Sequence, residues 1–103
     1  MTTHLPPDTE LVFISTPSHG YLRVIGDTET ARACATGYDY ETDAAVYLEE
    51  DLSAGIYLRH YGIADLRGIE QVSRASLSLE RIGARRLPAG SLGQVHMDSW
   101  RIH

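Results

Sequence analysis

The chain has 103 residues, a 43% hydrophobic fraction and a formal net charge of −5. This length suits one modest core, so we expect residues 1–103 to form a single domain. No apolar run approaches the roughly 18 residues of a membrane helix, and the N-terminus lacks the pattern of a signal peptide. The expected location is therefore the cytoplasm, without membrane association.

Cysteine and histidine usage limits the chemistry of the chain. The single cysteine, Cys34, excludes an internal disulfide framework and a cysteine-based zinc cluster. Because Cys34 lies among alanines, we predict that it is a small buried hydrophobic residue. The five histidines show no metal-ligand spacing. We therefore predict no metal site and no cofactor.

Charge is divided unevenly along the chain, and all nine basic residues are arginines. Residues 1–65 hold eleven acidic residues and three arginines, a net charge of −8. Residues 66–103 hold three acidic residues and six arginines, a net charge of +3. Because phosphate contacts need a positive face, we expect no direct binding to nucleic acid.

The first expected element, after a loose lead-in at residues 1–9, is a β-hairpin. Leu11–Ile14 is a continuous run of β-forming apolar residues, and Tyr21–Ile25 resumes the pattern. Between them, Thr16–Gly20 predicts a tight turn in which a proline presets φ and Gly20 adopts a positive φ.

Two helices and two strands are expected next. Asp27–Thr36 predicts a helix with small apolar residues. Tyr38–Glu41 and Ala44–Glu49 have the alternation typical of strands. A second helix is predicted over Leu52–Tyr61, with Asp51 as its capping residue.

The C-terminal third predicts one more strand and an extension. Alternating polar and apolar residues between Arg74 and Glu80 predict a strand that starts near Ile69 and ends at Gly83. Residues 84–103 are expected to form a last strand or to dock loosely. The order β-β-α-β-β-α-β is typical of an α+β fold, a small and mostly antiparallel sheet with two helices packed on one face.

The acidic tract that ends at Asp51 predicts a partner-binding surface. On Tyr38–Glu41, alternation puts the two tyrosines on one face and the two carboxylates on the other. If the tyrosines face the core, the carboxylates face water. The predicted negative surface consists of Asp39, Glu41, Asp43, Glu49, Glu50 and Asp51. The alternative interpretation is a solvated strand face with ordinary helix capping.

The turn around His19 suggests a second, small-ligand site. This alternative consists of Ser18, His19, Tyr21 and Arg23. His19 could act as a base, or bind an anion together with the amide of the following glycine. A purely structural role in the turn is the competing interpretation, because a nucleophile–base pair needs a third orienting group. We predict no catalytic residue.

Tyrosine is frequent, with six residues in the chain. If several tyrosines reached one surface, they would form a contact patch, because aromatic side chains anchor interfaces. The alternative is that most of them belong to the core or to its edge.

Two short segments carry a resemblance. Thr16–Val24, T-P-S-H-G-Y-L-R-V, and Val46–Asp51, V-Y-L-E-E-D, resemble a group of short uncharacterised proteins carried by bacteria, phages and plasmids. The likeness extends roughly from Phe13 to Tyr61. That group usually has a cysteine soon after E-E-D, where this chain has Leu52. The resemblance implies a compact α+β domain from a mobile-element setting, and it implies no functional residues.

Two functions follow as hypotheses. The first is a non-enzymatic accessory protein that binds a basic host or phage protein through the acidic surface. It would act as an inhibitor of a defence or nucleic-acid-handling protein, as an anti-CRISPR does, and it is compatible with a homodimer. The alternative is a small-ligand or nucleotide-binding protein, or a small hydrolase, that uses the His19 turn.

Overall fold

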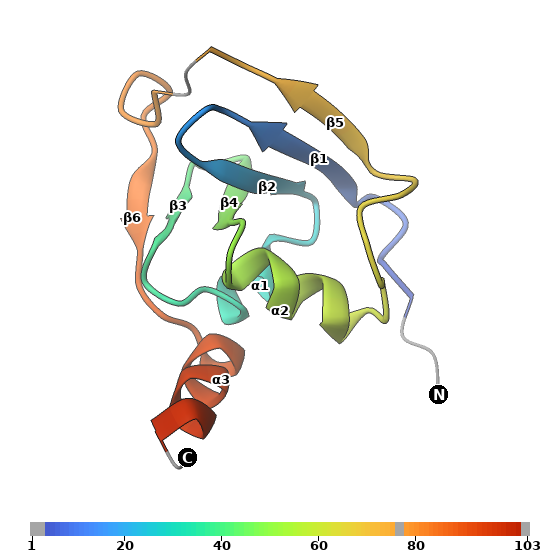
Figure 1. Cartoon of the computed structure of the whole chain (residues 1–103), viewed down its shortest axis with the longest axis vertical. Coiled ribbons are helices and arrows are strands. Elements are labelled where there is room, and N and C mark those ends of the chain that lie inside the picture. Colours follow the sequence, from blue (N-terminus) through green and yellow to red (C-terminus); the bar gives the residue numbers. More distant parts are fainter. Residues whose placement is uncertain (1–3, 76–77, 102–103) are drawn as a thin grey trace.

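The computed structural model describes residues 4–75 and 78–101. Its six-stranded sheet has the order β5-β1-β2-β4-β3-β6 (Figure 1). Neighbouring strands are antiparallel except β1 and β5, which are parallel. The elements in chain order are β1 (Glu10–Ser15), β2 (Gly20–Ile25), α1 (Thr28–Ala33), β3 (Asp39–Glu41), β4 (Ala45–Glu49), α2 (Ser53–His60), β5 (Glu70–Ser73), β6 (Arg85–Leu87) and α3 (Ser91–Arg101). The expected α+β class with a mostly antiparallel sheet is confirmed.

The predicted hairpin is confirmed. Strands β1 and β2 pair from Glu10 opposite Ile25 to Ser15 opposite Gly20. The Thr16 hydroxyl donates a hydrogen bond to the His19 carbonyl oxygen (2.6 Å) and accepts one from the His19 amide (3.0 Å). One short side chain therefore closes the turn from both sides.

Gly20 serves a different purpose from the one predicted. It is not among the glycines with positive φ, so the predicted left-handed conformation is wrong. Gly20 instead begins β2 in a crowded place. A Cβ atom there would lie 2.8 Å from the Phe13 ring and 2.9 Å from Oε1 of Glu50. Glycine is needed for space and not for backbone freedom.

Both faces of the central strands are buried. The face that carries Leu22, Val24, Val46 and Leu48 packs against the helix layer, in which Tyr57 is fully buried. On the opposite face, Ile14, Tyr21, Ala45 and Tyr47 form a second cluster that Leu79 partly covers. Burial on both faces explains why β2 and β4 are almost continuously apolar.

The predicted strand begins near Ile69 as expected, because β5 spans Glu70–Ser73, but its predicted continuation through Arg74, Ala75 and residues 78–83 is wrong. The parallel pairing of β5 with β1 runs only from Glu70 opposite Val12 to Ser73 opposite Ser15. The Arg74 amide still donates to the carbonyl oxygen of Ser15, where β1 ends (2.8 Å), and among the described residues the pairing goes no further. Residues 79–83 form turns, and residues 76–77 of the predicted strand lie outside the described residues.

The C-terminal extension, in which a last strand or loose docking was expected over residues 84–103, contains the short strand β6 and continues as the helix α3 over Ser91–Arg101. Strand β6 pairs with β3, and α3 then contacts both α1 and α2. A Cβ atom on Gly93 would lie 1.8 Å from the carbonyl oxygen of Ala35. The glycine thus lets the α3 backbone lie directly against the chain that follows α1.

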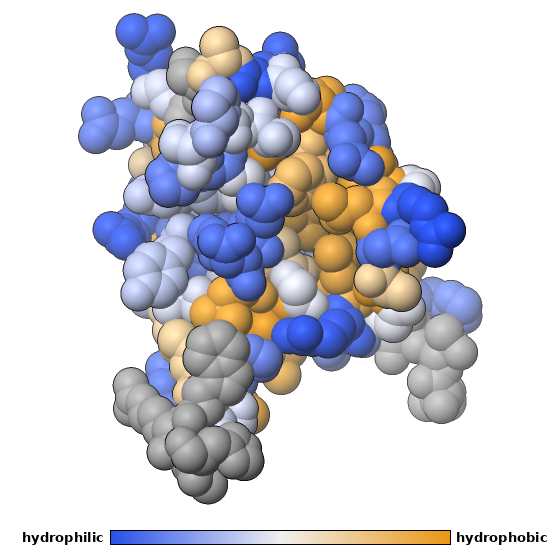
Figure 2. Space-filling model, viewed as in Figure 1, coloured by the Kyte–Doolittle hydropathy of each residue, from blue (hydrophilic) through white to orange (hydrophobic). Residues whose placement is uncertain are grey.

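Hydrophobic side chains reach the surface between the β1–β5 edge and α2, where Figure 2 shows them as an orange band. Leu11, Ile63, Leu66 and Ile69 are only partly buried and pack against the core. Within residues 4–75 and 78–101, none of the helices combines the length and hydropathy of a membrane-spanning segment.

We predict that Gly20→Val lowers the free energy of unfolding by at least about 1 kcal/mol, because the added atoms overlap Phe13 and Glu50. The measurement is the urea midpoint. Gly55→Ala is the matched control, because a Cβ atom on Gly55 in α2 would meet no neighbouring element within 4 Å. It should instead stabilise the helix by about 0.5–1 kcal/mol. An unchanged midpoint for Gly20→Val would contradict the steric explanation.

Candidate functional site

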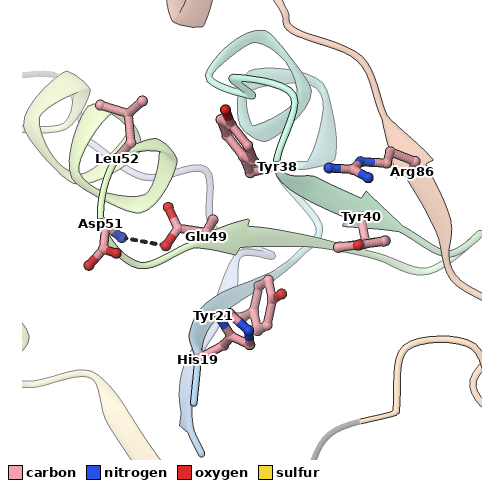
Figure 3. A pocket seen from close by; sticks show the side chains of 8 residues that line it. All are labelled: His19, Tyr21, Tyr38, Tyr40, Glu49, Asp51, Leu52 and Arg86. Carbon is pink, nitrogen blue, oxygen red and sulfur yellow. Dashed lines mark hydrogen bonds between the residues drawn. The ribbon is translucent and has the colours of Figure 1, made fainter.

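A pocket of about 560 Å³ lies where β2 begins, β4 ends and α2 starts (Figure 3). The turn before β2, the end of β4, strand β3 with the residue before it, and strand β6 all contribute side chains. The pocket therefore joins the predicted His19 turn to part of the predicted acidic tract. Its lining residues are His19, Tyr21, Tyr38, Tyr40, Glu49, Asp51, Leu52 and Arg86.

The predicted orientation of β3 is wrong. Asp39 is fully buried, whereas Tyr38 is 60% exposed. The alternation itself exists, but Asp39 faces the helix layer and Tyr40 packs on the opposite face with Tyr21. Asp39 therefore does not belong to any water-facing acidic surface.

The buried Asp39 carboxylate is fully occupied by donors. Its Oδ2 atom accepts hydrogen bonds from the Thr36 amide (2.8 Å) and the Ser53 hydroxyl (2.9 Å). Its Oδ1 atom accepts one from the Glu49 amide (2.7 Å). The buried hydroxyls of Thr36 and Ser53 lie 2.7 Å apart and share a further hydrogen bond. These contacts compensate for the desolvation of the carboxylate and tie the backbone of the pocket residue Glu49 to the loop after α1 and to the start of α2.

Aromatic rings form two walls of the pocket. The rings of Tyr21 and Tyr40 meet edge to face, with centroids 6.3 Å apart and an interplanar angle of 76°. The guanidinium of Arg86 lies 5.7 Å from the centroid of the Tyr40 ring, and its Nε donates a hydrogen bond to the Gly37 carbonyl oxygen (3.2 Å). Burial raises the pKa of the Tyr21 hydroxyl, and neighbouring Tyr40 and Glu49 raise it further.

Glu49 provides a half-buried carboxylate at the other end of the pocket. Its Oε1 atom accepts a hydrogen bond from the Asp51 amide at 3.0 Å (Figure 3). The predicted capping role of Asp51 is wrong, because the N-cap of α2 is Leu52 and no side chain caps it. Burial raises the pKa of Glu49, and the negative charges of Asp51 and Asp39 add to this effect, while hydrogen bonds from backbone amides oppose it.

The predicted acidic surface is smaller than its six residues suggest. Glu41 pairs with Arg32 at 2.8 Å, and Asp43 pairs with Arg85 at 3.2 Å. Among the described side chains, the segment Glu49–Asp51 takes part in no ion pair. Uncompensated negative charge is therefore concentrated at the turn that joins β4 to α2.

The predicted ligand-binding set is divided by the fold. His19 and Tyr21 line the pocket, and Ser18 is exposed in the hairpin turn. Arg23 lies farther along β2 opposite Tyr47, and its Nε has no hydrogen-bond partner.

Sequence reasoning did not assign Tyr38, Tyr40, Leu52 and Arg86 to a site. The number of tyrosines was the one available signal, because three of them meet here. For Arg86 there was no local signal, because it reaches the pocket through the pairing of β6 with the distant strand β3.

A second polar cluster links α2 to the start of α1. The hydroxyls of Tyr57 and Tyr61 both donate to Oδ2 of Asp27. Cys34 is fully buried nearby, and burial raises the pKa of its thiol to about 12. The prediction that Cys34 is a small buried hydrophobic residue is confirmed, and this cluster joins helices rather than forming a site.

No protein-family model, curated protein or solved structure matches this chain. Within the described ranges, no group of three or more histidine, cysteine, aspartate or glutamate side chains could hold a metal ion.

We predict that Asp39→Asn lowers the free energy of unfolding by about 1–3 kcal/mol. An asparagine keeps one acceptor oxygen but turns an NH₂ group toward donors, so at least one buried hydrogen bond is lost. Asp43→Asn is the matched control, because the Asp43 side chain is 97% exposed and its ion pair with Arg85 should contribute little. Equal losses of stability in the two variants, measured by urea unfolding, would contradict the role of the Asp39 network.

Because the pKa of Glu49 is raised in the folded protein, this residue should make the free energy of unfolding fall as pH rises. Its folded state prefers the protonated form, so its contribution to stability is complete below the unfolded pKa and is lost as pH rises through the folded pKa. A glutamine at this position cannot ionise. The stability of Glu49→Gln relative to the wild type should therefore increase as pH rises from the unfolded pKa of Glu49 through its folded pKa. Urea midpoints across the acidic range test this, with Glu50→Gln controlling for the loss of one surface carboxylate. A relative stability of Glu49→Gln that stays constant or falls as pH rises would contradict it.

Proposed function

We propose that this chain is a non-enzymatic binding protein that recognises a basic segment of a partner protein at the pocket and at Glu49–Asp51. One observation carries the proposal: these three consecutive carboxylate residues form no ion pair among the described side chains, and two of them, Glu49 and Asp51, line a pocket together with tyrosines. Tyrosine side chains supply contact area at little entropic cost, and unpaired surface charge steers a partner of opposite sign.

A more specific form of the proposal is inhibition of a defence or nucleic-acid-handling protein. The resemblance of Thr16–Val24 and Val46–Asp51 to mobile-element proteins favours it. Proteins that bind nucleic acid present basic grooves to phosphates. An acidic protein seated in such a groove would compete with the nucleic acid.

Binding of a small ligand, such as a nucleotide, is the second candidate. It is favoured by a concave pocket of about 560 Å³ with His19 and Arg86 in its lining. This volume lies within the range of about 300–1,000 Å³ that is typical of ligand pockets. The hydrolase version has less support, because no hydrogen bond joins the His19 ring to an orienting carboxylate among the described residues.

We predict that the triple variant Glu49→Gln, Glu50→Gln and Asp51→Asn associates about tenfold more slowly with its basic partner at low salt. The partner is obtained by affinity capture from a bacterial lysate, and association is then measured at low and high ionic strength. High salt should reduce the difference between the wild type and the variant, because ions screen exposed charges.

The matched control is the triple variant Glu41→Gln, Asp43→Asn and Asp65→Asn. These carboxylates are already paired with arginines, so their loss should change association little. Equal association of the wild type and the Glu49–Asp51 variant at low salt would contradict the proposed function.

A further inference from the structure

The end of the pocket that holds Glu49 combines charge with apolar walls. One carboxylate oxygen of Glu49 accepts the Asp51 amide. The other oxygen points toward the space between Tyr38 and Leu52 (Figure 3). A charged acceptor, an aromatic ring and an aliphatic side chain therefore face the same volume.

Resting on the proposed function, we infer that this end of the pocket receives a single cationic group on an apolar stem, a basic side chain of the partner protein. Aromatic rings attract cations, and they do so more strongly where water is excluded. The molecule already contains such a contact, because Arg86 lies over the Tyr40 ring. Leu52 would pack against the aliphatic stem of the incoming side chain.

The charges around this volume favour a cation over an anion. Glu49 from β4 and Asp51 from the following turn line the pocket, and the buried Asp39 of β3 lies directly behind Glu49. Arg86 is the one arginine among the described residues that line the pocket, and the Gly37 carbonyl oxygen holds it near Tyr40, away from Asp51 and Leu52 (Figure 3). A cation beside Glu49 is therefore nearer to the carboxylates of Glu49 and Asp51 than to the Arg86 guanidinium (Figure 3).

The first test uses a matched pair of small probes. The isotope-labelled full chain is titrated with Nα-acetyl-arginine amide and followed by NMR. Nα-acetyl-citrulline amide has the same shape and a neutral head group. We expect saturable shift changes at Tyr38, Glu49 and Leu52 with the arginine probe, and affinity lower by about tenfold with the citrulline probe.

Variants then test the sign of the electrostatics. Glu49→Gln keeps an acceptor oxygen for the Asp51 amide but removes the charge, and Tyr38→Ala removes an exposed ring. Both should weaken binding of the arginine probe. Arg86→Gln should strengthen it, because it removes a like charge, whereas the same variant would weaken an anion site. Asp43→Asn should leave the affinity unchanged, and a wild-type-like spectrum of each variant shows that it is folded.

The probe experiments would overturn the inference if they gave no saturable shifts with the arginine probe, equal responses to the two probes, or tight binding of adenosine monophosphate that Arg86→Gln weakens. Association with the captured partner distinguishes failure of this inference from failure of the proposed function. If Tyr38→Ala leaves association with the captured partner intact, the pocket inference fails, whereas recognition of a basic partner through the charges of Glu49–Asp51 stands. If the probe binds but loss of the Glu49–Asp51 charges leaves association unchanged, the proposed function fails.

Discussion

The buried Asp39 carboxylate is the contact on which the arrangement of the site depends. It accepts hydrogen bonds from the loop after α1, from the end of β4 and from the first residue of α2. One side chain thereby holds these three segments together. Because neighbouring residues of a strand alternate in direction, burying Asp39 also turns Tyr40 to the opposite face. The shape of the pocket is therefore a consequence of a polar network on its far side.

Much of the fold could be predicted because its signals are local. The hairpin and both expected helices follow from the spacing of apolar residues and from turn chemistry within short windows. The direction of β3 could not be predicted in this way, because alternation identifies two faces without saying which one is buried. That choice was decided by the Thr36 amide and the Ser53 hydroxyl, which donate to the buried carboxylate and so supply partners that a lone aspartate would lack.

The candidate site combines residues that sequence reasoning had divided between two hypotheses. His19 belongs to the turn before β2, and Glu49 to the end of β4. The pairing of β2 with β4, which places Tyr21 opposite Glu49, brings them to one pocket. The reduction of the acidic surface could not be foreseen either, because Arg32 and Arg85 reach their carboxylates from α1 and β6. Contacts between distant parts of the chain thus brought His19 and Glu49 into one pocket and removed Glu41 and Asp43 from the uncompensated acidic surface.

The parallel pairing of β1 with β5 also affects how the molecule opens. Strand β5 is short, and its side chains are mostly exposed and polar. Its pairing with β1 also requires closure of the long loop of chain between these two strands, which costs entropy. Such an element belongs to the low-stability end of a protein, and it opens before the central strands do. Its departure would leave the outer backbone edge of β1 unpaired, next to a partly open apolar surface. By pairing with β1, β5 therefore covers a backbone edge to which a strand of another molecule could otherwise add.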